Sequence, residues 1–182
     1  MSKTGLSRPC QCERAGHNPK LVVLTGGPGA GKTAVLELVR KSMCEHVAVL
    51  PEAASIVFGG GFPRHDTLPA RMGAQRTILH VQQQLERIML EEGKAAIALC
   101  DRGTLDGLAY WPGSEVEFWK EIGSSRETEL GRYAAVIHLR TPHAHQGYNQ
   151  SNPVRLESAE QAFLVDEKIL AAWSGHPKRI VI

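Results

Sequence analysis

The chain has 182 residues, which is enough for one domain with a full hydrophobic core and too few for two of comfortable size. Apolar residues make up 42% and charged residues 22%, and the formal net charge is only +2, which argues against a dedicated nucleic-acid binder. No apolar run reaches the length of a membrane span, and the N-terminus lacks a secretory pattern. We expect no membrane or nucleic-acid partner, and a cytoplasmic location that suits four cysteines without a disulfide spacing.

Residues 1–19 are polar and without a period, so we predict a disordered tail followed by one domain over residues 20–182. Short apolar runs predict strands at residues 20–25, 47–50, 95–100, 134–139 and 179–182. Helices are predicted at residues 34–45, 74–92, 115–122, 127–132 and 157–173, and residues 59–63 are expected to be a loop. This alternation is typical of an α/β domain with a parallel sheet and helices on both faces.

Apolar spacing also predicts which helix faces are buried. In the first helix these are Val35, Leu38 and Val39. In the helix over residues 74–92 they form one stripe of Ile78, Val81, Leu85, Ile88 and Met89.

The segment between the first strand and the first helix matches the phosphate-binding pattern G-x-x-x-x-G-K-[ST] in full. It reads Gly26, Gly27, Pro28, Gly29, Ala30, Gly31, Lys32 and Thr33, and Ala34 continues into the helix. Glycines let several backbone N–H groups face one anion, and the helix N-terminus adds the positive end of its dipole. We expect Lys32 to meet the β- and γ-phosphates of ATP, and Thr33 to bind Mg²⁺.

Further polar residues follow the other strands, at the sheet edge where ligands bind in such folds. Asp101 is a candidate to hold a water of the Mg²⁺ shell, and the alternative is that it caps the end of the strand. The guanidinium of Arg102 suits bidentate contact with phosphate. Glu52 follows the second strand. Two interpretations of Asp106 stay open: it holds the acceptor or a metal-bound water, or it is a turn residue beside Gly107.

Two arginines flank a polar segment after the fourth strand. Arg140 follows that strand and Arg155 precedes the next helix. We expect this segment to close as a lid over the triphosphate, where either guanidinium would stabilise the transferring phosphoryl group. The alternative is that both are surface residues, with Arg155 paired to Glu157 or Glu160.

These motifs together resemble known families. Thymidylate kinases and deoxynucleoside kinases carry such a phosphate loop, an Asp-Arg or Glu-Arg pair after the third strand and an arginine-bearing lid after the fourth. Small AAA-type ATPase domains related to nicotinamide riboside kinases are more similar still, with Glu-Ala-Ala after the second strand, here residues 52–54, and Asp-Arg-Gly-Thr-Leu-Asp after the third, here residues 101–106. One departure is Gly103, where thymidylate kinases have an aromatic residue.

The resemblance implies a three-layer P-loop NTPase fold with strand order 2-3-1-4-5. It also makes Glu52 the candidate base, because a glutamate in that place takes the proton from the acceptor hydroxyl in deoxynucleoside kinases; otherwise it is a helix-start acid after Pro51. The preferred function is a phosphotransferase that uses ATP and Mg²⁺ on a small, nucleoside-like acceptor. The alternatives are an ATP- or GTP-hydrolysing switch and a nucleotide-sensing module that act on a protein partner.

Overall fold

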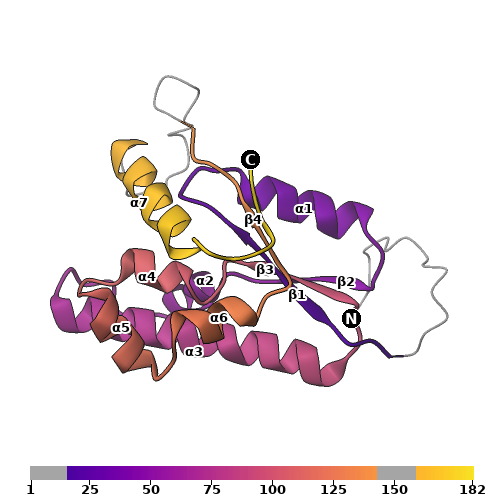
Figure 1. The fold of residues 1–182 in the computed structure, drawn as a ribbon, viewed down its shortest axis with the longest axis horizontal. Coiled ribbons are helices and arrows are strands. Elements are labelled where there is room, and N and C mark those ends of the chain that lie inside the picture. Colours follow the sequence, from indigo (N-terminus) through magenta and orange to yellow (C-terminus); the bar gives the residue numbers. More distant parts are fainter. Residues whose placement is uncertain (1–15, 143–158) are drawn as a thin grey trace.

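A single parallel β-sheet forms the centre of the molecule (Figure 1). The structure, a computed structural model, describes residues 16–142 and 159–182. The strands lie in the order β2-β3-β1-β4-β5, with all neighbours parallel, which confirms the fold class and the strand order. Their bounds are β1 Lys20–Thr25, β2 Val47–Leu50, β3 Ile97–Asp101, β4 Ala135–His138 and β5 Arg179–Val181. Pairing of Leu24 with Asp101 and of Thr25 with His138 places three strand ends side by side.

Helices cover both faces of this sheet, with α1 on one face and α3 to α6 on the other (Figure 1). In the described ranges the helices are α1 Lys32–Ser42, α2 Ala53–Gly59, α3 Leu68–Glu92, α4 Asp106–Tyr110, α5 Glu115–Ile122, α6 Arg126–Gly131 and α7 Ala159–Ala172. None of them is long and apolar enough to cross a membrane.

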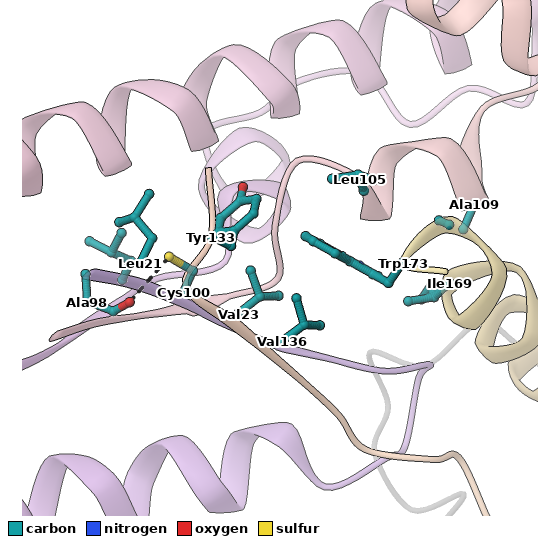
Figure 2. Packing of buried hydrophobic residues seen from close by; sticks show 12 residues of the cluster. Leu21, Val23, Ala98, Cys100, Leu105, Ala109, Tyr133, Val136, Ile169 and Trp173 are labelled. Carbon is teal, nitrogen blue, oxygen red and sulfur yellow. Dashed lines mark hydrogen bonds between the residues drawn. The ribbon is translucent and has the colours of Figure 1, made fainter. Parts of the chain in front are cut away.

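The side chains of β1 alternate between two buried apolar clusters because successive residues of a strand point to opposite faces. Leu21 and Val23 pack in the cluster that contains Trp173, which follows α7 (Figure 2). Leu24 packs with Leu36 of α1 on the other face. The loop that leaves β1 therefore starts from a strand held on both sides.

The face predicted for the first helix is wrong in part, since Val39 packs against the buried cluster but the other two residues do not. Leu36 is the buried residue of α1, whereas Leu38 is 63% exposed and Val35 is 36% exposed. The rotation of α1 about its axis is set by the phosphate loop from which it starts, and apolar spacing alone does not report that constraint.

The apolar stripe predicted for α3 is wrong in part. Ile88 is 53% exposed, while Gln82 and Glu86 are 3% and 0% exposed. Leu85 and Met89 do pack against the main cluster. Two polar residues are tolerated on the buried face because their side chains are hydrogen-bonded there.

Some elements were not predicted from the sequence. The helices α2 and α4 span seven and five residues, which is too short for an apolar period to be recognised. The long helix α3 begins at Leu68 rather than at residue 74, with proline in its first turn. Of the expected tail, residues 1–15 lie outside the described part, and the backbone N–H of His17 donates to the Gly93 carbonyl.

Candidate active site

The phosphate loop connects β1 to α1 at the carboxyl edge of the sheet. Gly26, Gly29 and Gly31 have φ values of 136°, 82° and 87°, which side-chain-bearing residues rarely adopt. A Cβ at Gly26 would also lie 2.0 Å from the Leu139 carbonyl oxygen. The glycines of the motif are therefore required by backbone conformation and by close approach to the end of β4.

Lys32, the first residue of α1, directs its ammonium back into this loop. Its Nζ donates to the carbonyl oxygens of Gly26 and Gly27 at 2.7 and 2.9 Å. Burial, and after it the Arg102 guanidinium, lower the pKa of Lys32 to about 7. An anion bound at this loop would offset both effects and favour the charged ammonium.

Asp101 ends β3 directly beside the last residues of β1. Burial, and after it the Glu52 carboxylate, raise the pKa of Asp101 to about 6. No hydrogen bond or ion pair to the Asp101 or Thr33 side chain is found within residues 16–142 and 159–182. The site thus offers the Thr33 hydroxyl and the Asp101 carboxylate, and a cation would balance the charge of the carboxylate.

Arg102 joins the elements of the site. Its Nε donates to Glu52 Oε1 at 2.7 Å, and its Nη1 lies 3.1 Å from Asp106 Oδ2 and 3.3 Å from the Gly26 carbonyl oxygen. Burial opposes the charge, but Tyr110 and the two carboxylates outweigh it and raise the pKa of Arg102 well above its usual value. Its φ of 71° is left-handed, a conformation that costs a non-glycine residue about 1–3 kcal/mol.

Glu52, the residue before α2, faces Arg102. Its Oε2 accepts a hydrogen bond from the Ser55 hydroxyl at 2.5 Å. Burial raises the pKa of Glu52, but Arg102 and Ser55 outweigh burial and the net pKa is lowered. Glu52 is therefore a carboxylate at neutral pH.

A cavity of about 670 Å³ opens beside the phosphate loop, between α2, α3 and α4. Its walls include Glu52, Phe58, Arg64, Gln75, Arg102 and Tyr110. The Arg64 guanidinium lies 4.3 Å from the centre of the Phe58 ring. The cavity thus combines aromatic surface with a few polar groups, as binding sites for small molecules do.

Comparisons with known proteins identify the family and the fold. A family model described as an AAA domain matches residues 21–182. The chain belongs to this AAA domain family. No curated protein matches the sequence.

Solved structures similar to this AAA domain include two thymidylate kinases. The enzyme from Ehrlichia chaffeensis aligns with a TM-score of 0.56 at 14% identity, over 91% of this chain and 93% of that one. The enzyme from Candida albicans aligns with a TM-score of 0.63 at 10% identity, over 91% of this chain and 83% of that one. The AAA domain therefore has the fold of a P-loop kinase-like NTPase.

In this AAA domain Asp106 is the buried first residue of α4 and lines the cavity beside the phosphate loop. Its side chain is 5% exposed. The Thr25 hydroxyl lies 2.8 and 2.7 Å from its two oxygens, and the Trp173 indole N–H donates to Oδ1 at 2.6 Å. The indole also explains Gly103, where a Cβ would lie 2.8 Å from two atoms of the Trp173 ring.

Arg140 lies at the end of β4 and contacts α7. Its Nε donates to Asp166 Oδ2 at 2.7 Å, and its Nη2 donates to Glu167. Asp166 is fully buried and also accepts from the Gly27 N–H at 2.7 Å and contacts His138 Nε2 at 2.9 Å. The AAA domain thus connects Arg140 to the phosphate loop through Asp166.

Sequence reasoning did not assign Asp166 or Trp173 to the site, although one signal of Asp166 is present in the sequence. Both belong to the last predicted helix region, where an aspartate in the middle of an apolar face is unusual. Arg155 lies outside the described residues.

Proposed function

We propose that this chain transfers the γ-phosphoryl group of ATP, with Mg²⁺, to a hydroxyl or phosphate of a small, nucleoside-like molecule. The observation that carries the proposal is the cavity beside the phosphate loop, with Glu52 and Arg102 in its wall. A protein that only hydrolyses ATP has no need of an acceptor cavity at this position. The thymidylate kinase-like fold supports the same conclusion.

On the donor side, Lys32 exchanges its two carbonyl partners for β- and γ-phosphate oxygens. The backbone N–H groups of residues 29–34 and the N-terminus of α1 complete the phosphate site. Because phosphoryl transfer asks mainly for positioning and charge stabilisation, these groups supply most of the donor chemistry.

The residues present fit Mg²⁺. Thr33 and Asp101 offer oxygen atoms, and Mg²⁺ in such enzymes is held by one or two protein oxygens together with phosphates and water. The raised pKa of Asp101 reflects unbalanced negative charge next to Glu52, which a cation would relieve. Bound there, Mg²⁺ would neutralise charge on the β- and γ-phosphate oxygens.

On the acceptor side, Glu52 is the base in this proposal. Arg102 and Ser55 orient its carboxylate, and its lowered pKa keeps it ionised at neutral pH. Arg102 links this carboxylate to the Gly26 carbonyl of the phosphate loop. The guanidinium therefore sets the acceptor side relative to the donor side.

ATP is the proposed donor because the sequence contains no N-K-x-D guanine signature. Arg140 and Arg155 remain candidates for charge stabilisation. For Arg140 this requires exchange of its contacts with Asp166 and Glu167 for phosphate oxygens.

The test is a thermal-shift screen of nucleosides, nucleotides and nucleoside-like cofactor precursors with a non-hydrolysable ATP analogue and Mg²⁺. A true acceptor raises Tm by mass action, and with ATP it accelerates ADP formation and becomes labelled by the γ-phosphate. The control is Lys32→Ala, which removes labelling. Hydrolysis of ATP at one rate whatever compound is added, with no stabilising compound, would refute the kinase proposal and favour a switch.

A further inference from the structure

A buried carboxylate lies on α3, outside the phosphate loop and the cavity wall. The side chain of Glu86 is 0% exposed. It accepts hydrogen bonds from the Arg132 guanidinium, from the Tyr133 hydroxyl at 2.7 Å and from Gln82 Nε2 at 2.9 Å. A carboxylate removed from water requires such partners, and these three donors stabilise the buried charge of Glu86.

Two of these partners also hold the loop that carries Arg102. The Gln82 amide donates to the Arg102 carbonyl oxygen at 3.3 Å. The Tyr133 hydroxyl accepts a hydrogen bond from the Thr104 N–H at 2.9 Å. Figure 2 shows the Tyr133 hydroxyl directed away from the sheet. Both chains of contacts therefore lead from Glu86 to residues 102–104.

The charge on Glu86 sets the direction of these hydrogen bonds. A carboxylate only accepts, so Gln82 and Tyr133 must both donate to it. The second N–H of the Gln82 amide is then available for the Arg102 carbonyl, and the Tyr133 oxygen is available to accept from Thr104. Burial, and after it Glu86, raise the pKa of Tyr133 well above its usual value, which keeps the hydroxyl a donor.

The loop needs such support because Arg102 has a left-handed backbone. We propose that Glu86 is a positioning residue that, through Gln82 and Tyr133, holds Arg102 in the geometry needed to align Glu52 with the phosphate loop. This inference rests on the proposed function. Active-site groups must be held by surrounding contacts, because a displacement of about 1 Å can lower a rate about a hundredfold.

The decisive variant is Gln82→Met, which removes the contact to the Arg102 carbonyl and leaves Glu86 paired with Arg132 and Tyr133. Turnover of MgATP without acceptor and the Kd for MgATP are measured in the wild-type and Arg102→Ala backgrounds. We expect Gln82→Met to lower kcat about tenfold or more with Kd within about twofold, and to have no further effect when Arg102 is already absent. Glu86→Gln should act in the same way, and Glu91→Gln, on the exposed part of the same helix, is the matched control.

A second readout needs no turnover. The NMR signal of the Arg102 Nε–H group reports its bond to Glu52, and we expect it to shift and exchange faster in Gln82→Met but not in Glu91→Gln. An unchanged signal, or a rate loss that is equally large without Arg102, would overturn the positioning role. Failure of the acceptor screen would refute the proposed function instead, and the NMR comparison would still decide this inference.

Discussion

Replacement of Asp106 by asparagine tests the buried centre of the site. Trp173 donates to Oδ1, Arg102 donates to Oδ2, and the Thr25 hydroxyl contacts both oxygens. An asparagine must place its NH₂ group where one of these oxygens was. In either orientation a donor then faces the N–H of Trp173 or of Arg102, and no rotation of the amide removes the conflict.

The expected loss follows from the burial of Asp106. Removing a hydrogen bond to a buried charged group costs about 1.5–3 kcal/mol, and the unsatisfied donor adds to this loss. We therefore expect Asp106→Asn to lower the free energy of unfolding by about 3 kcal/mol, which is roughly 6–12 °C in Tm for a chain of this size. Urea unfolding followed by circular dichroism measures it, with Glu91→Gln as an exposed control that stays within about 0.5 kcal/mol.

A double-mutant cycle identifies the cause. Trp173→Phe removes the indole N–H, so the asparagine NH₂ can turn toward the ring without meeting a donor. The double variant should then lose at least about 1 kcal/mol less than the sum of the two single variants. Costs that simply add, or a loss below about 1 kcal/mol for Asp106→Asn, would refute this reasoning.

Three further predictions concern the chemistry of the site. Lys32→Ala should abolish turnover and strongly weaken MgATP binding while the fold remains, and normal binding with normal turnover in that variant would reject the proposed function. Glu52→Gln should lower kcat by about 10²- to 10⁴-fold in single-turnover assays with little change in MgATP affinity, whereas an unchanged kcat would leave Glu52 as a helix-start acid. Because the folded state raises the pKa of Asp101 to about 6, ionisation of this group opposes folding above that pH and not below the ordinary aspartate pKa of about 3.9. Asp101→Asn should therefore raise the Tm of the nucleotide-free protein by a few °C at neutral pH but not at low pH, and should weaken the Mg²⁺ dependence of ATP binding; an equal Tm gain at both pH values would contradict this explanation.

The phosphate loop and the sheet were predictable because their signals are local. A backbone that turns around an anion needs glycines, and residues 26–33 contain them. The buried strands are continuous apolar runs. The bounds predicted for the first two strands agree with β1 and β2. The sequence also predicted that three site residues lie at one edge of the sheet, because each follows a predicted strand: Glu52, Asp101 and Arg102.

The tertiary structure decided the partners of these residues. Gly27 meets Asp166 across 139 positions, and Asp106 meets Trp173 across 67, so no local pattern could pair them. Likewise, Gln82 and Glu86 lie on the buried face of α3 because Arg102, which follows β3, and Arg132 and Tyr133, which follow α6, satisfy their polar groups there. The sequence by itself determined what this edge of the sheet can bind, since the chemistry of the motif is local. Which side chains orient Arg102 and Asp106 depended on packing between distant elements, and only the folded chain contains those contacts.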